Sequence, residues 1–378
     1  MRTPCEFHGG TPLRPFLLVG ATLLINVLAA RAAIGQEADL AIGALERAAV
    51  IDGLVGKILK IYVYPDVAKQ MEQAIRDRQA KKEYDTISSC LELAKVLTRH
   101  LRDICKDDHL SVDFFANGIP YDSEKKPDPR EVEEYRRAGM RRNYEFRKVE
   151  RLEGGIGLLQ VDGFYPAEWI TETAAGAMSF LANSESIILD LRQNSGGQSG
   201  GGLLCSYFFK EETHLTDFYN RPENTTRQFW SYPVAGAEKF ADKDLFILTS
   251  RLTFSASEAL AYDMQALKRA TIVGETTGGG AHGTTIYRIT DHFSASIPFC
   301  RGINPATKTD WEGTGVKPDV AVPADQALLT AHLLALKKAH TKYADKPDVA
   351  NNLKRVIAGK EKELEALKKV AIECTPTP

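Results

Sequence analysis

Between residues 36 and 112, apolar side chains recur at the three- and four-residue spacing that is typical of amphipathic helices. Two stretches carry the pattern: Val50, Ile51, Leu54, Val55, Ile58 and Leu59, then Leu91, Leu93, Ala94, Val96, Leu97, Leu101 and Ile104. The pattern predicts an N-terminal helical subdomain over residues 36–112. Residues 113–150 interrupt it with many charged residues and prolines, which indicates an excursion on the surface.

Over residues 151–323, short apolar runs alternate with helical patterns. We expect strands at 156–161, 187–191, 245–248 and 271–273, and helices at 169–181, 200–209 and 256–267. This alternation indicates crossover connections, a mainly parallel sheet and a site at the carboxyl ends of its strands. The sequence therefore predicts an α/β core over 151–323, followed by helices over 324–378.

The first 35 residues resemble an export signal. Arg2 and Arg14 precede an apolar run of about 15 residues, and small residues follow it. A membrane-spanning helix needs about 20 apolar residues, so a cleaved signal peptide is favoured over an uncleaved anchor. The expected location is secreted or periplasmic, without stable membrane insertion once the signal is removed.

The formal net charge is −2, and both signs are mixed along the chain. No basic stripe is present, so nucleic acid is not an expected partner. Six cysteines lack CxxC or Cys/His metal spacing, so we expect no metal and no cofactor. Cys90 and Cys105 fall at opposite ends of one expected helix, about 22 Å apart, and cannot pair. The pairing of Cys205, Cys300 and Cys374 stays open, as does oligomerisation.

Ser255 lies where the segment TSRLTFSASE joins an expected strand to an expected helix. A serine at this junction projects from the sheet edge beside N–H groups of the first helical turn, including that of Ala256, which could stabilise an oxyanion. The same residues also form a capping box, because Ser255 and Glu258 are spaced to satisfy the helix N-terminus. Nucleophile and cap are therefore both open on this motif alone.

A glycine-rich loop, NSGGQSGGG, covers residues 194–202 between an expected strand and an expected helix. Glycines let the backbone approach a ligand and direct N–H groups toward negative charge. This loop contains neither of the common nucleotide-binding glycine motifs. Gly196 and Gly197 are therefore candidate oxyanion donors, with a flexible turn as the alternative.

Taken together, these segments resemble the tail-specific, or C-terminal processing, serine peptidases. DLRQNSGG at 190–197 is similar to the DLRxNxGG loop of that family, and SASE at 255–258 followed by RATIVGETTGGG at 269–280 is similar to its SASE…RAxxVGExTxG segment. The resemblance spans about residues 52–322. It implies a ClpP/crotonase-like fold, a polypeptide substrate and Ser255 as the nucleophile.

The sequence departs from the processing branch at the general base. That branch uses a lysine where this chain has Gly280, and an unassisted serine is a poor nucleophile. The tricorn-core branch uses His, Ser and Glu instead; residues 107–112 and 311–319 resemble the segments that supply its His and Glu. This resemblance implies His109 as the base and Glu312 as its carboxylate partner, with Asp108 where tricorn has an orienting serine.

His282 is the rival base or a pocket residue, because it lies in the glycine-rich loop beside Gly280. With histidine as the base, we expect a pH profile that rises near pH 6 to 7. Residues 114–149 are too short and too charged for a PDZ insertion, and the N-terminal helices resemble the retinoid-binding branch of the family. A non-catalytic binder of an apolar ligand and an ester hydrolase are the alternatives to a peptidase.

Overall fold

The computed structural model describes residues 38–119 and 128–373. The expected signal segment, Cys5 and Cys374 lie outside these residues. A six-stranded sheet forms the centre of the α/β core, in the order β11-β8-β7-β4-β3-β2. Its strands are β2 (Phe146–Leu152), β3 (Ile156–Val161), β4 (Ser186–Asp190), β7 (Asp244–Thr249), β8 (Thr271–Gly274) and β11 (Val320–Ala321).

The core sheet is parallel from β11 to β3, and only the edge strand β2 is antiparallel. This arrangement confirms the prediction of a mainly parallel α/β core. Strand β4 is buried at all five positions, because helices cover both faces of the sheet and leave no polar side.

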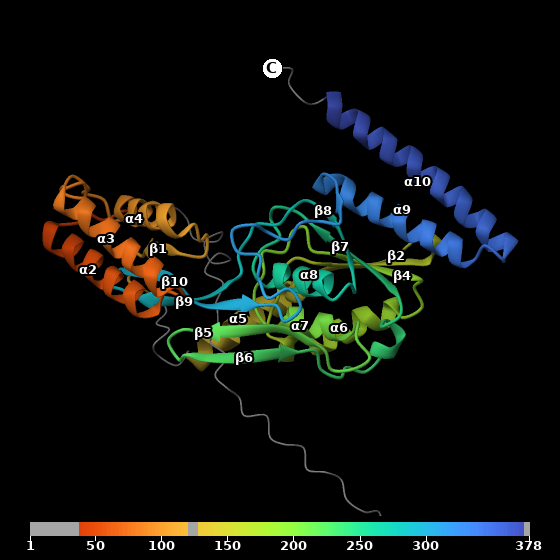
Figure 1. The fold of residues 1–378 in the computed structure, drawn as a ribbon, viewed down its shortest axis with the longest axis horizontal. Helices are drawn as coiled ribbons and strands as arrows, with labels where there is room; N and C mark the ends of the chain where they lie inside the picture. The colour runs from red at the N-terminus through yellow and green to blue at the C-terminus, as the bar shows by residue number, and fades with distance from the viewer. Residues whose placement is uncertain (1–37, 120–127, 374–378) are drawn as a thin grey trace, which may run out of the picture.

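Three helices cover one face of this sheet: α6 (Ala167–Leu181), α7 (Gly200–Ser206) and α8 (Ala256–Ala266). Helix α9 (Ala324–Lys342) covers the other face, and α10 (Pro347–Glu373) packs along α9. In Figure 1, α10 extends away from the body of the protein. Three 3₁₀ turns complete the core: η1 (Asn143–Glu145), η2 (Glu153–Gly155) and η3 (Ala237–Lys239).

A second, antiparallel sheet was not predicted from the sequence. It contains β1 (Ser111–Phe114), β5 (His214–Asn220), β6 (Thr225–Trp230), β9 (His282–Arg288) and β10 (Phe293–Ile303). Strand β10 pairs with β1 near one end and with β5 near the other, and β9 runs beside it. This sheet connects the core to the N-terminal helices (Figure 1).

The N-terminal region is helical, as predicted. It contains α2 (Ala44–Ile61), α3 (Pro65–Ala80) and α4 (Cys90–Cys105), which bury one apolar cluster against β1 and β10. Ser89 caps α4 by accepting a hydrogen bond from the Glu92 N–H. The expected surface excursion contains a helix, α5 (Pro129–Arg141), and part of β2.

Cys90 and Cys105 lie at the two ends of α4, as expected. The four cysteines in the described part of the chain, which also include Cys205 and Cys300, are free thiols. Among the described helices, none is long and apolar enough to span a bilayer.

Candidate active site

Ser255 lies in a strained turn between β7 and α8. Its backbone angles are φ 56° and ψ −121°, a region that side chains other than glycine rarely adopt. Such strain persists only where the surroundings enforce it, and it is concentrated at functional sites. The side chain is partly exposed. The strand-turn-helix context matches the way in which nucleophilic serines are presented at the edge of other α/β sheets.

The buried carboxylate of Glu258 holds this turn in place. It accepts hydrogen bonds from the backbone N–H groups of Ser255 (2.8 Å), Gly279 (2.7 Å) and Gly280 (2.8 Å), and from the Thr277 hydroxyl (2.5 Å). Burial raises the pKa of Glu258, and these hydrogen bonds oppose that rise. The bond from Ser255 is the glutamate half of the capping box, so the cap is present and Glu258 also ties α8 to the loop after β8.

The glycine-rich loop lies directly against Ser255. Because β4 and β7 are parallel neighbours, the segments that follow them meet at one edge of the sheet. The Asn194 carbonyl accepts hydrogen bonds from the Phe254 N–H (3.1 Å) and the Ser257 hydroxyl (2.7 Å). A Cβ added to Gly196 would lie 2.8 Å from Ser255 Cβ. Ser257 is fully buried in this junction.

The three predicted oxyanion donors differ in availability. The Gly196 N–H donates to Asn194 Oδ1 at 2.8 Å. The N–H groups of Gly197 and Ala256 donate to no acceptor in the described part of the chain. Gly196 and Gly197 have φ of +99° and +130°, and this left-handed backbone favours glycine. The structure thus leaves Gly197 and Ala256 as available donors and uses Gly196 to hold the loop.

His109 packs beside the nucleophile turn. Its ring lies 4.6 Å from the Phe254 ring, centroid to centroid, and its side chain is 11% exposed. Neither ring nitrogen has a hydrogen-bond partner among the described residues. Burial lowers the pKa of His109 to about 4, although the charge of Asp107 opposes this shift. Buried polar side-chain atoms without a partner are uncommon in folded proteins.

The environment of Gly280 accounts for the departure from the lysine pattern. A Cβ at this position would lie 2.5 Å from His109 Cε1 and 2.3 Å from Phe254 Cζ. A lysine cannot occupy position 280 unless both rings move. The His109 ring therefore fills the space beside the position where the processing branch carries its base.

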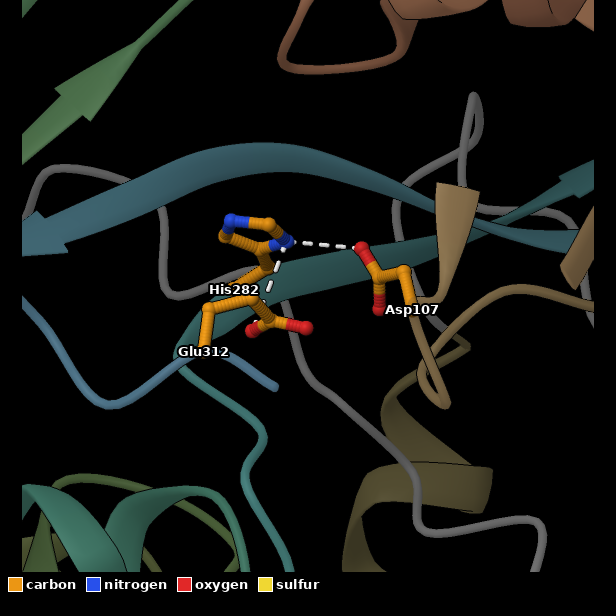
Figure 2. Close-up of side chains that lie close together, drawn as sticks. All are labelled: Asp107, His282 and Glu312. Atoms are coloured by element: carbon orange, nitrogen blue, oxygen red, sulfur yellow. Dashed lines mark hydrogen bonds and ion pairs between the residues drawn. The ribbon is translucent and has the colours of Figure 1, made fainter. Parts of the chain in front are cut away.

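Asp107, His282 and Glu312 form a buried cluster of charged groups (Figure 2). His282 Nδ1 is 2.6 Å from Asp107 Oδ2 and 3.5 Å from Glu312 Oε2. Glu312 Oε2 also accepts a hydrogen bond from the Ala281 N–H at 2.6 Å. Glu312 thus contacts His282, and the carboxylate closest to His109 is that of Asp107, 3.8 Å from Nδ1.

Asp107 was missed by sequence reasoning, which considered its neighbour Asp108. The Asp108 side chain is 68% exposed and faces Arg102, whereas that of Asp107 is 1% exposed. Asp107 Oδ1 accepts the His109 backbone N–H at 3.0 Å, which is a turn bond formed two residues along the chain. The spacing of an aspartate two residues before a histidine could have predicted this turn bond from the sequence. The spacing does not predict that Asp107 is buried.

A metal ion is another possible reason for this cluster. In the described part of the chain, potential ligand atoms lie close enough to hold a metal ion at Asp107, His282 and Glu312. Two ligands of one zinc ion, each about 2.0–2.2 Å from the metal, are separated by about 3 Å or more. The 2.6 Å between Asp107 and His282 is instead the length of a charge-assisted hydrogen bond.

Comparison with solved structures places this fold among known ones. A putative peptidase from Parabacteroides merdae has a TM-score of 0.56 and 18% identity, covering 77% of this chain and 96% of that chain. A lipoprotein from Streptococcus agalactiae has a TM-score of 0.53 and 15% identity, with the same coverage. These similarities show a shared α/β fold.

Two family models then match successive parts of the chain. Peptidase family S41 matches residues 155–322, and the N-terminal domain of peptidase S41 in eukaryotic IRBP matches residues 41–138. The chain belongs to peptidase family S41. The second match agrees with the predicted resemblance of the N-terminal helices to the retinoid-binding branch.

Curated relatives match part of the chain. A carboxyl-terminal-processing protease of Synechocystis is 30% identical over 139 residues, which is 37% of this chain and 31% of the relative. The chloroplastic carboxyl-terminal-processing peptidase 2 of Arabidopsis thaliana is 30% identical over 142 residues, 37% of this chain and 27% of the relative. The chain thus spans less than a third of the length of these relatives.

Proposed function

We propose that this protein is a serine-type peptidase that cleaves peptide bonds in unfolded polypeptides. The observation that carries the proposal is the strained Ser255 turn, next to a buried histidine whose nitrogens have no partner among the described residues. Membership of peptidase family S41 supports it. The lysine of the processing branch is replaced by Gly280, so the chemistry needs a different base, and His109, whose ring packs against Phe254 beside Ser255, is the candidate.

In the proposed mechanism, Ser255 Oγ attacks the carbonyl carbon of the scissile bond while His109 takes the hydroxyl proton. The tetrahedral intermediate collapses, the C–N bond breaks, and the imidazolium of His109 gives its proton to the leaving amine. Water, activated by the same histidine, then hydrolyses the acyl-enzyme and regenerates Ser255.

The oxyanion of each tetrahedral intermediate is stabilised by backbone donors. Of the predicted set, Gly197 and Ala256 have N–H groups that donate to no acceptor in the described chain, while Gly196 shapes the loop. The N–H of Ala256 belongs to the first turn of α8, where the helix dipole favours negative charge. Preorganised donors of this kind are worth about 2.7–4 kcal/mol each in acyl transfer.

The carboxylate proposed to support His109 is that of Asp107, whereas the sequence resemblance implied Glu312. Glu312 remains part of the proposed site, but its contact is with His282. Asp107 is the carboxylate nearest to Nδ1 of His109, and it can stabilise the imidazolium that forms during the reaction. Nε2 of His109 is then the nitrogen that exchanges the proton with Ser255.

The remaining parts of the proposal rest on the sequence. The apolar segment before residue 36 supports export to a secreted or periplasmic location. The expected substrate is an extended polypeptide, because the peptide bonds of an unfolded chain are accessible to an active site. A binding protein for an apolar ligand is the competing function, and the match of residues 41–138 to an IRBP domain favours it among the alternatives.

Turnover of an unfolded polypeptide tests the proposal. Wild-type protein is incubated with reduced and alkylated casein, and new amino termini are quantified against the Ser255→Ala variant. Cleavage by wild type that the variant lacks supports the peptidase. Binding of a fluorescent retinoid by both proteins, with cleavage by neither, would instead identify a non-catalytic binding protein.

A further inference from the structure

His282 lies at the centre of a buried group of ionisable side chains that come from separate parts of the chain. It opens β9, whereas Asp107 belongs to the turn between α4 and β1, and Glu312 to the loop between β10 and β11. The His282 side chain is 2% exposed and that of Asp107 is 1% exposed. Burying these groups is costly unless they are paired, so their pairing constrains how the three segments pack.

Asp107 connects this group to the proposed base. Its Oδ2 accepts hydrogen bonds from His282 Nδ1 at 2.6 Å and from the Tyr62 hydroxyl at 3.3 Å. Its Oδ1 accepts the His109 backbone N–H and lies 3.8 Å from His109 Nδ1. With Oδ2 held on one side, Oδ1 is directed toward His109.

The surroundings of His282 favour its charged form. Burial opposes that charge, but the hydrogen bond and the negative charge of Asp107 outweigh it, and Glu312 and Asp310 act in the same direction, so the pKa of His282 is raised. Burial and the charge of Asp107 raise the pKa of Glu312 to about 7. Burial disfavours the charged form of Asp107 as well, yet the two histidines and their hydrogen bonds hold its pKa below the ordinary value.

Beyond Asp107 and Glu312, the groups around the His282 ring are aromatic side chains and an arginine that lies further from it. The Tyr64 ring meets the imidazole edge to face at 5.5 Å, and the Arg301 guanidinium lies 5.3 Å from that ring. Arg301 is also the residue opposite His282 in the pairing of β9 with β10. Behind Asp107, burial and the negative charge of Asp107 raise the pKa of Tyr62 far above its usual range.

We propose that His282 is a positioning residue for catalysis: an imidazolium whose Nδ1 faces both Asp107 and Glu312, which directs Asp107 toward His109 and, together with burial, keeps His109 neutral. This inference rests on the proposed function, because it presumes that His109 is the base. Glu312 Oε2 supports the imidazolium at the same nitrogen, 3.5 Å from Nδ1, so that it acts on His109 through His282 and Asp107. The same arrangement accounts for the distance between Glu312 and the proposed base.

The positive charge of His282 has a measurable consequence for His109. An imidazolium beside Asp107 partly cancels the attraction of that carboxylate for a proton on His109, and the charge of His282 is among the causes that lower the pKa of His109. Removing the charge while retaining the hydrogen bond should raise the pH at which His109 becomes a free base. Because a nearby charge moves a pKa by about one unit or more, the shift is large enough to measure.

The test uses His282→Asn, whose side-chain N–H can replace Nδ1 as the donor to Asp107 without carrying a charge. The second-order rate of Ser255 labelling by a fluorophosphonate is measured from pH 3.5 to 8, so no substrate needs to be known. In His282→Asn, the pH at which the labelling rate falls on the acid side (the acid limb) should move up by about one unit. The maximum rate at higher pH (the plateau) should stay within a few fold of wild type. In His282→Phe, which also loses the donor, the plateau itself should fall by about tenfold or more.

The chain supplies a matched control. His214 Nε2 also lies 2.6 Å from a carboxylate, that of Asp217, but on β5 and outside this group, so His214→Asn should leave the acid limb unchanged. Thermal melting checks that each variant is folded. An acid limb in His282→Asn that coincides with that of wild type would overturn the inference, as would labelling that a chelator abolishes and Zn²⁺ restores. If wild-type Ser255 does not react at all, it is the proposed function that fails.

Discussion

The proposed nucleophile side and the proposed base side of the site are built in different ways. Ser255 and the glycine loop follow β7 and β4, two neighbouring parallel strands, and are joined by short-range backbone contacts at one sheet edge. His109, His282 and Glu312 come from segments up to about 200 residues apart in the chain and meet where the N-terminal helices and the antiparallel sheet adjoin the core. One side is fixed by backbone geometry, and the other by buried charge pairs.

This difference predicts that the two sides fail differently when they are altered. Changes on the nucleophile side should remove chemistry outright or strain the backbone. Changes on the base side should alter protonation and orientation, with the fold preserved wherever a hydrogen-bonding substitute is available.

The largest effect is expected for Ser255→Ala. Loss of the hydroxyl removes the covalent route, and turnover of a polypeptide substrate should fall by at least about 10⁴-fold. Loss of an N-terminal cap costs about 0.5–2 kcal/mol, so the variant should remain folded, which circular dichroism and thermal melting can check. A Ser255→Ala protein that keeps its turnover would exclude Ser255 as the nucleophile.

Gly197→Ala should come next. Alanine keeps the backbone N–H, but a Cβ at Gly197 would lie 2.1 Å from the Phe164 carbonyl oxygen, so the loop must shift and turn this donor away from the oxyanion. Loss of one oxyanion donor lowers kcat by about 10²–10³. We therefore expect a lower melting temperature as well as a lower kcat. Gly202→Ala is the matched control, since a Cβ there meets no atom within 4 Å.

The structure distinguishes between the glycines further along the loop. A Cβ at Gly200 would lie 2.7 Å from the Tyr165 carbonyl oxygen. Gly200→Ala should thus be destabilising, whereas Gly202→Ala should be neutral. Normal kcat in folded Gly197→Ala would mean that the loop is a turn and that the donors lie elsewhere.

Asp107→Asn, compared with Asp108→Asn, tests the base side. Asparagine at 107 retains a similar shape but removes the charge that stabilises imidazolium at His109, so kcat should fall by about 10²-fold or more, with little change in KM. Asp108 is exposed, and Asp108→Asn should stay within about twofold of wild type. Equal effects at the two positions would contradict the role of Asp107.

The sequence predicts the Ser255 side of the site better than the His109 side. The strand-turn-helix segments around residues 190–202 and 249–258 are contiguous, and their periodicity and glycines predict both the elements and Ser255. The contact of Glu312 with His282, and the burial of Asp107 beside exposed Asp108, depend on long-range packing that no local pattern encodes. The second sheet was missed for the same reason, because its strands pair across long stretches of the chain; Ser111 of β1, for example, lies opposite Ser296 of β10.

A smaller effect is expected in the pH dependence of the wild type. The ordinary pKa of histidine places the rising limb near pH 6 to 7, but burial lowers the pKa of His109 to about 4. Since His109 must be neutral to accept a proton, kcat/KM should stay high at pH 6 and decline only as the pH falls toward 4. A limb centred near 6.5 would show that His109 is solvated or that another group is the base.

The most direct measurement is the site of covalent labelling by a fluorophosphonate, located by peptide mass spectrometry in wild type and in His109→Ala. The account predicts one labelled residue in the wild type, Ser255, and labelling that is slower by at least about 10²-fold in folded His109→Ala. Labelling of a different serine, or labelling of Ser255 at the same rate without His109, would contradict a peptidase site built from Ser255 and His109.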